Sequence, residues 1–196
     1  MYKVDERFYP KDFEMDFNSA HRHYLRYLTA LKMVGRLGVN ELWLDCACGC
    51  GYGTDIISNF TTNIHGYDID DGTINYAEKN YNKNNISFLH KFPSNKYDVI
   101  FSLETIEHID KKNGIKFLKN LSLLLKDGGI FVITTPISKT TGPNKTNKFH
   151  KCEYCLDEFL KVLSKLNLKI DNVILNETKF TDGSVKDQGY FKLIKE

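Results

Sequence analysis

The chain has 196 residues, enough for one α/β domain with a sizeable core, and its net charge is +2, from 27 basic and 25 acidic residues. So small a charge is not the electrostatic footprint of a protein that binds duplex nucleic acid. No apolar run is long enough to span a bilayer, and the start M-Y-K-V-D-E-R lacks a signal-peptide core. Five cysteines, an odd number, predict a reduced cytoplasmic protein without a disulfide framework.

The predicted elements alternate between helix and strand after an irregular arm over residues 1–18. Helices are predicted, in chain order, over 19–37, 52–58, 73–80, 115–125 and 156–166. Strands are predicted over 41–46, 63–67, 85–89, 97–102, 130–135, 169–175 and 190–194. Asp127-Gly128-Gly129 is expected to stop the fourth helix, residues 138–147 to form a flexible loop, and Asp182-Gly183 to lie in the loop between the last two strands.

Strand–helix alternation over five strands predicts a mostly parallel sheet with helices on both faces, which is the doubly wound α/β class. The last two strands have no helix between them, so we expect them to pair as an antiparallel edge. No repeat or low-complexity linker interrupts the chain. The sequence therefore favours a single domain over residues 1–196.

The most informative stretch is 42–54, which reads L-W-L-D-C-A-C-G-C-G-Y-G-T. An apolar strand meets a carboxylate and then breaks into three alternating glycines, Gly49, Gly51 and Gly53. A strand, a glycine-rich turn and a helix together are typical of a nucleotide-binding loop, because glycine lets backbone N–H groups approach a ligand. The dinucleotide pattern G-x-G-x-x-G would need glycine where Thr54 stands, which argues against a dehydrogenase. The alternative is a structural turn without a ligand.

The pattern D-x-A-x-G-x-G-x-G resembles motif I of the class I S-adenosylmethionine (SAM) dependent methyltransferases, whose first glycine is often alanine, as here. This resemblance implies a Rossmann-like, seven-stranded sheet with one reversed strand, and SAM as the cofactor. The methionine end and the ribose of SAM would need backbone atoms that can approach them closely. The cofactor residues assigned to this loop are Asp45, Ala47, Gly49 and Gly51.

A carboxylate at the tip of the second strand is needed to accept from both ribose hydroxyls of SAM. Asp68 lies 23 positions after Asp45, near the offset of about 20 expected for a ribose-binding acid. The alternative for Asp68 is a helix cap or a solvated loop acid, although Asp70 fits a cap better. The acid with which many family members bind adenine is missing from L-H-K-F-P-S-N-K. Adenine would then be held by backbone groups or by packing against Ile69 and Phe92.

Two further residues are assigned to the cofactor. Arg26, in H-Y-L-R-Y-L-T-A, is the candidate cation for the methionine carboxylate, and its alternative is an exposed surface arginine. Leu103, at the end of the fourth strand, is the second residue assigned to the cofactor.

After the fourth strand comes S-L-E-T-I-E-H-I-D, in which Glu104, Glu107 and His108 would share one face of a helical turn. They follow the carboxyl end of a strand, where open α/β sheets hold their ligands. Two carboxylates and an imidazole can bind a divalent metal such as Mg²⁺ or Mn²⁺, and His150 or Glu153 in N-K-F-H-K-C-E-Y could add a ligand. The neighbouring C-x-x-C is interpreted as packing rather than a zinc site.

E-T-I-E-H-I resembles the E-V-I-E-H motif of ubiquinone-biosynthesis O-methyltransferases and of small-RNA 3′-terminal 2′-O-methyltransferases. The latter resemblance implies four residues as metal ligands and catalytic groups: Glu104, Glu107, His108 and His150. A third resemblance covers nearly the whole chain. H-x-x-R-Y-x-x-A, D-x-A-C-G-x-G-Y-G, S-x-E-T-I-E-H and N-x-F-H-x-x-E-Y-x-x-x-E-F follow in this order in bacterial methyltransferases implied to act on capsular or cell-surface glycans.

These motifs predict a cytoplasmic SAM-dependent O-methyltransferase whose acceptor is a small polar molecule, a sugar or nucleotide-linked sugar of a surface glycan. A divalent metal could activate the acceptor hydroxyl, or His108 or His150 could act as general base. Residues 1–40 are expected to lie over the active site and 136–154 to contact the acceptor. One alternative is an RNA 3′-terminal ribose 2′-O-methyltransferase, which the weak basic charge disfavours. Others are a non-catalytic SAM-binding subunit and purely structural roles for Glu104 and His108.

Overall fold

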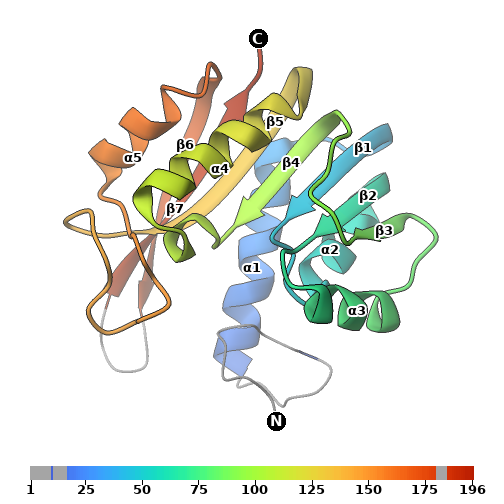
Figure 1. Ribbon diagram of the computed structural model, residues 1–196, viewed down its shortest axis with the longest axis horizontal. Coiled ribbons are helices and arrows are strands. Elements are labelled where there is room, and N and C mark those ends of the chain that lie inside the picture. Colours follow the sequence, from blue (N-terminus) through green and yellow to red (C-terminus); the bar gives the residue numbers. More distant parts are fainter. Residues whose placement is uncertain (1–9, 11–16, 180–184) are drawn as a thin grey trace. The chain divides into compact units, whose positions relative to one another are not determined.

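The computed structural model describes residue 10, residues 17–179 and residues 185–196 (Figure 1). The predicted N-terminal arm therefore lies almost entirely outside the described residues, as does the predicted loop at Asp182-Gly183. The chain divides into two compact units, one ending at Ser94 and the other beginning at Asn95. The single domain over residues 1–196 stays a prediction. No helix in the described part of the chain is both long and apolar enough to cross a membrane.

The strands belong to a seven-stranded, mostly parallel sheet, which confirms the predicted α/β class. The first unit holds three parallel strands in the spatial order β3-β2-β1: β1 (Gly38–Cys46), β2 (Thr61–Tyr67) and β3 (Ile86–Leu89). The second unit holds the order β4-β5-β7-β6: β4 (Tyr97–Leu103), β5 (Leu125–Ile137), β6 (Lys169–Lys179) and β7 (Val185–Ile194). β4 and β5 are parallel, whereas β7 is antiparallel to both β5 and β6, so the last strand is the reversed one, as predicted.

The helices of the first unit are α1 (Phe17–Val34), α2 (Tyr52–Ile57) and α3 (Asp71–Asn80), with a 3₁₀ turn η1 (Ser58–Phe60). α1 ends before the predicted Leu37, because Gly35 has a φ of +75° and donates its N–H to the Leu31 carbonyl at 3.2 Å. The buried stripe of α1 is Tyr27, Ala30, Leu31, Met33 and Val34. Tyr24 and Leu25, on the same helix, are exposed.

The helices of the second unit are α4 (Lys111–Leu123) and α5 (Leu156–Leu163), with a 3₁₀ turn η2 (Ile106–His108). α4 begins earlier than predicted because Asp110 caps it and accepts the Asn113 N–H at 3.1 Å. In Figure 1, α4 lies against β5 of the same unit. Phe159 of α5 packs edge to face on Phe191 of β7, with ring centroids 4.8 Å apart.

The predicted stop signal Asp127-Gly128-Gly129 does not end a helix directly. It lies within β5, where the register changes from Tyr97 opposite Leu125 to Val99 opposite Ile130. The extra residues of β5 form an irregularity in which Gly128, with φ of +74°, donates its N–H to the Lys195 carbonyl at 2.7 Å. The glycine pair thus permits a bulge at the start of a strand.

Two features of the sheet place the chemically interesting side chains. In the first unit, Cys46 of β1 is level with Tyr67 of β2, so the glycine loop after β1 is beside Asp68 after β2. In the second unit, Leu103 of β4 is level with Thr134 of β5, so the segment after β4 runs beside residues 134 and 135. Within each unit, parallel pairing brings the carboxyl ends of neighbouring strands to one edge, and the candidate cluster of that unit forms there.

Candidate active site

The three glycines in the loop of the first unit fall into two groups, according to what surrounds them. A Cβ on Gly51 would lie 2.7 Å from the Ala77 Cβ, and one on Gly53 would lie 2.1 Å from the Tyr27 ring, so both are required by packing. Gly49 has a φ of +54°, and a Cβ there would meet no atom within 4 Å. The space at Gly49 is therefore open, as a ligand that approaches the backbone would need.

Ala47 also takes a left-handed backbone conformation, with a φ of +64°. This is unusual for a residue with a side chain and costs of order 1 kcal/mol. The next residue, Cys48, donates its N–H to the Tyr67 carbonyl at 2.9 Å and so ties the loop to the end of β2. Strained backbone that is held in place by its neighbours is common at ligand-binding loops.

Asp45 at the end of β1 is buried and accepts a hydrogen bond of 2.7 Å from Thr54 Oγ1 at the start of α2. Burial raises the pKa of Asp45 to about 7; the Thr54 hydrogen bond opposes this shift and the charge of Asp68 adds to it. The contact joins the strand to the helix across the loop. Thr54, which excluded a dinucleotide in the sequence, thus has a definite structural partner.

Asp68 braces the same loop from β2. One oxygen accepts the Gly49 N–H at 3.0 Å, and the other accepts the Asp70 N–H at 3.0 Å. The helix cap is Asp70, which accepts the Thr73 N–H at 2.7 Å, so the prediction that Asp70 is the better cap is confirmed. Both carboxylate oxygens of Asp68 are thus oriented by backbone N–H groups next to the end of β2.

Two apolar side chains near Asp68 are strongly exposed. Ile69 is 87% exposed and Phe92 is 43% exposed. The Phe92 ring is held edge to face on Tyr67, with centroids 5.5 Å apart. Apolar side chains exposed beside a carboxylate at a strand end suit a flat, partly apolar group such as a purine.

Arg26 on α1 is partly buried, so the alternative of an exposed surface arginine is wrong. Its positive charge acts on three neighbouring groups, His23, Tyr27 and Tyr52. His23 Nδ1 lies 2.7 Å from the Tyr52 hydroxyl, and the two tyrosine rings pack edge to face at 5.5 Å. Burial, together with the nearby charges of Arg26 and Arg22, lowers the pKa of His23 to about 4. His23 is therefore neutral at pH 7 and was missed by sequence reasoning, although it stands three residues before Arg26.

In the second unit, Glu104 directly follows β4 and has a φ of +50°. Its N–H donates to the Thr134 carbonyl at 3.1 Å. Its carboxylate accepts from Thr134 Oγ1 at 2.8 Å and from Gln188 Nε2 at 2.6 Å. The side chain is therefore oriented by two strands, β5 and β7. Leu103, the residue before it, is 7% exposed at the end of β4.

The expectation that Glu104, Glu107 and His108 share one helical face is wrong in part. Only residues 106–108 form a turn, the 3₁₀ turn η2, and Glu104 stands before it in a left-handed conformation. Glu107, His108 and His150 do converge: each offers a ligand atom, and these atoms lie within 4.8 Å of one another. Glu104 is not a member of this group, so three of the four implied ligands come together.

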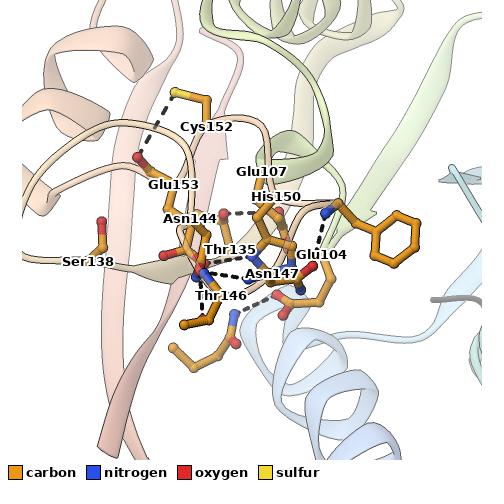
Figure 2. A network of polar contacts seen from close by, with 12 residues as sticks. Glu104, Glu107, Thr135, Ser138, Asn144, Thr146, Asn147, His150, Cys152 and Glu153 are labelled. Atoms are coloured by element: carbon orange, nitrogen blue, oxygen red, sulfur yellow. Dashed lines mark hydrogen bonds and ion pairs between the residues drawn. The ribbon is translucent and has the colours of Figure 1, made fainter. Parts of the chain in front are cut away.

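Glu107 is 1% exposed, and its Oε2 accepts from Thr135 Oγ1 at 3.0 Å (Figure 2). The His108 and His150 rings meet edge to face, with centroids 4.9 Å apart. His150 is brought there by the segment after β5, whose Cys152 N–H donates to the Glu107 carbonyl at 3.0 Å. A buried carboxylate close to two imidazoles can accept a proton, bind a cation or orient a hydroxyl.

The donor set of this group can be compared with the needs of a metal. Two imidazoles and one carboxylate suit a transition metal such as Mn²⁺ better than Mg²⁺, which prefers oxygen ligands. Ligating side chains usually have supporting hydrogen bonds, and here Thr135 supports Glu107 while Glu153 supports His150. The residues therefore fit a divalent transition metal.

The loop over residues 138–147 contains neither helix nor strand, as predicted, but it is internally hydrogen-bonded. Asn144 Oδ1 accepts the N–H groups of Thr146 and Asn147 at 2.8 and 2.9 Å. The N–H of Asn144 donates to the His150 carbonyl at 3.0 Å. The hydrogen bond from Asn144 thus joins the loop to the residue His150 that follows it.

All five cysteines are free thiols. Cys152 is buried and Cys155 precedes α5, and neither belongs to the His150 group. Their interpretation as packing residues rather than zinc ligands stays a prediction. In the glycine loop, burial raises the pKa of Cys46, so it stays a thiol at neutral pH.

Four residues with direct roles in these contacts carried no recognisable sequence signal: Thr134, Thr135, Asn144 and Gln188. Each is a common polar residue without a motif, and each acts through a neighbour that only folding supplies. Glu153 was considered only as a possible metal ligand. In the structure it is a partner of His150, at 2.6 Å from Nδ1.

The fold and several sequences resemble known proteins. The structure superposes on the N-methyltransferase NodS of Bradyrhizobium japonicum with a TM-score of 0.72 at 14% identity, covering 92% of this chain and 99% of that one. It superposes on the magnesium protoporphyrin IX methyltransferase of Synechocystis with a TM-score of 0.68 at 16% identity, covering 94% and 86%. At these identities the likeness concerns the fold alone.

In sequence, the chain is 26% identical over 139 residues to a "probable S-adenosylmethionine-dependent methyltransferase" of Mycolicibacterium smegmatis, covering 67% of this chain and 53% of that protein. It is 30% identical over 141 residues to malonyl-[acyl-carrier protein] O-methyltransferase 2 of Ilyobacter polytropus, covering 64% and 54%. The chain thus spans about half the length of these relatives. A family model described as a methyltransferase domain matches residues 18–169, and the chain belongs to this family of methyltransferase domains.

Proposed function

We propose that the chain is a SAM-dependent O-methyltransferase that acts on a hydroxyl of a small polar acceptor, a sugar or a nucleotide-linked sugar. The observation that carries the choice of a hydroxyl is the convergence of buried Glu107 with His108 and His150. Family membership supports methyl transfer in general, and this cluster supports an acceptor that has to lose a proton.

The first unit has the features that SAM requires. Gly49 offers open backbone, and Asp68 is a carboxylate already fixed by two N–H groups. We assign Asp68 to the ribose hydroxyls, Ile69 and Phe92 to the adenine, and Arg26 to the methionine carboxylate. Asp45 and Ala47 act indirectly in this scheme, because their contacts and conformation shape the loop.

The second unit has the features that activate a hydroxyl. Methyl transfer from a sulfonium is an in-line displacement, so the acceptor oxygen must face the methyl group and give up its proton. A sugar hydroxyl is a weak acid and needs help to do so. His108 or His150 can take the proton as general base, and the carboxylate of Glu107 stabilises the imidazolium that results.

A divalent metal is a second route to the same activation. Glu107, His108 and His150 would hold it, with Mn²⁺ preferred over Mg²⁺ because two of the three ligands are imidazoles. Such a metal acts as a Lewis acid that lowers the pKa of a bound hydroxyl. Glu104, which is held by Thr134 and Gln188 instead, would then orient the acceptor.

The proposal is tested by a screen with methyl-labelled SAM over nucleotide sugars, free sugars, catechols and short RNAs. We expect label on a sugar oxygen, and a Glu107→Gln variant that binds SAM as wild type does but transfers no methyl group. Label confined to an RNA 3′ end would move the assignment to the RNA alternative. SAM binding without any transfer would favour a non-catalytic subunit, and absence of SAM binding in calorimetry would overturn the proposal.

A further inference from the structure

We propose that Glu153 is the positioning residue for His150 and that Asn144 completes this arrangement. The inference rests on the proposed function, because it concerns how one member of the Glu107, His108 and His150 group is oriented. Glu153 is only 6% exposed, and its carboxylate faces into a polar network of the second unit (Figure 2).

The contact defines the proton position on the His150 ring. Nδ1 lies 2.6 Å from Glu153 Oε1. An ionised carboxylate only accepts hydrogen bonds, so the imidazole must donate from Nδ1. In the neutral ring the lone pair is then on Nε2, which becomes the atom able to accept a proton or bind a metal. Glu153 thereby selects the tautomer in which His150 can work.

Asn144 holds Glu153 in this role. Its Nδ2 donates to the same carboxylate oxygen at 2.6 Å, so Oε1 receives two hydrogen bonds. The other end of the Asn144 amide accepts from two backbone N–H groups of its own loop. The amide therefore joins the loop directly to the carboxylate that orients His150.

The backbone fixes the same geometry. Gly142 and Glu153 exchange two hydrogen bonds, each of 2.9 Å, and Asn144 donates its N–H to the His150 carbonyl at 3.0 Å. Glu153 is thus anchored through both its main chain and its side chain. A surface carboxylate in the next helix, Glu158, shows the contrast: it forms an exposed ion pair with Lys111. Glu158 therefore provides a matched control.

The experiment records the imidazole ¹⁵N signals of His150 by NMR at mildly alkaline pH, where imidazoles are neutral. We expect the Nδ1–H tautomer in the wild type and in Glu153→Gln, because glutamine still offers an acceptor oxygen. In Glu153→Ala we expect a mixture of both tautomers. Glu158→Gln should match the wild type. An Nε2–H tautomer in the wild type, or unchanged tautomers in Glu153→Ala, would overturn the inference.

Kinetics on the same variants separate positioning from a structural role. Loss of a partner that orients a functional histidine typically costs about 10–100-fold in activity. We expect a fall in kcat of this size for Glu153→Ala, partial recovery in Glu153→Gln, and SAM affinity within about twofold of wild type. Asn144→Ala should lower kcat less than Glu153→Ala does. Equal loss of kcat in Glu153→Gln and Glu153→Ala would contradict the proposed role.

The two proposals can fail separately, because the NMR measurement needs neither acceptor nor turnover. If the tautomer depends on Glu153 but no acceptor is methylated, the positioning role stands and the proposed function fails. If methyl transfer occurs and Glu153→Ala changes neither tautomer nor kcat, the positioning role fails alone. Should Glu153→Ala not fold, the wild-type tautomer and the Glu153→Gln variant still decide the question.

Discussion

The side-chain amide of Gln188 donates a hydrogen bond of 2.6 Å to the carboxylate of Glu104, although the two residues are 84 positions apart in sequence. Thr134 Oγ1 donates to the same oxygen at 2.8 Å. Glu104 has a left-handed backbone, which costs about 1–2 kcal/mol for a residue with a side chain. The two hydrogen bonds help offset that cost and fix the direction of the carboxylate.

Replacing Gln188 by alanine should lower turnover without lowering SAM affinity. The Glu104 carboxylate would lose the hydrogen bond from Gln188 and become less well oriented. We expect about a tenfold fall in kcat and a loss of stability of about 1 kcal/mol. Turnover assays and urea unfolding measure both quantities. Asn172→Ala, on the exposed side of β6, is the control. A turnover loss no larger than that of the control would show that Gln188 does not act on Glu104.

The two clusters should respond differently to mutation. Asp68→Ala removes the acceptor of the Gly49 and Asp70 N–H groups and of the ribose hydroxyls, so SAM affinity should fall about 10–100-fold. Glu107→Ala should keep SAM affinity and lose turnover. Calorimetry and a methyl-transfer assay compare the two, with the exposed Asp71→Asn as control. Similar losses of SAM affinity in both variants would mean that the division of roles is wrong.

Two glycines provide a matched test of the open backbone. Gly49 and Gly128 both have a positive φ, and a Cβ on either would meet no atom within 4 Å. Substitution of either glycine by alanine should therefore lower the free energy of unfolding by about 1 kcal/mol, which thermal unfolding measures. Only Gly49→Ala should also lose SAM binding, because its methyl group would enter the proposed ligand space. Equal SAM affinity in the two variants would contradict a backbone contact at Gly49.

Metal dependence separates the two routes of hydroxyl activation. If a metal is used, excess chelator should abolish turnover, and Mn²⁺ should restore it more effectively than Mg²⁺. Calorimetric titration with Mn²⁺ should show binding to the wild type that Glu107→Gln weakens by about tenfold or more. Turnover that persists in excess chelator would assign His108 and His150 to general-base roles instead.

His23 should make stability depend on pH. Its pKa is lowered to about 4 in the folded chain from 6.5, so the unfolded chain binds more protons between these values. Stability therefore rises with pH across this window and is lost as the pH falls. Relative to His23→Gln, which can still accept from Tyr52, the wild type should lose up to about 3 kcal/mol between pH 6.5 and 4. Urea unfolding of both proteins at several pH values measures this difference.

The free energy of unfolding of the wild type should be compared with that of His23→Gln at each pH, because Asp45 changes stability with pH in the opposite direction. Its pKa is raised to about 7 from 3.8, so its contribution to stability falls as the pH rises through this range. Asp45 is present in both proteins, so its effect cancels in the comparison. A wild-type-minus-variant difference that does not change with pH would show that His23 is not buried in neutral form.

The sequence by itself determined the order of strands and helices, the α/β class, the glycine loop and the Asp70 cap. These depend on local patterns, such as apolar runs, glycines and capping residues, which act over a few positions. The family resemblance implied Glu104, Glu107, His108 and His150 as one set of ligands, and three of these four residues come together. The ligand atoms of Glu107, His108 and His150 lie within 4.8 Å of one another, whereas Glu104 is not part of the group.

Only the tertiary structure decided the partners of these residues. Glu104 lies outside the expected helical face, and its backbone N–H is held by Thr134. Asp127-Gly128-Gly129 lies in a bulge, where the register of β5 against β4 shifts. Gln188 and Glu153 acquired their roles from strand pairing and from a loop that folds back on itself. Hydrogen bonds between residues far apart in sequence depend on distances that local patterns do not encode. For this chain, sequence therefore predicted the chemical groups, and the fold determined how each is oriented.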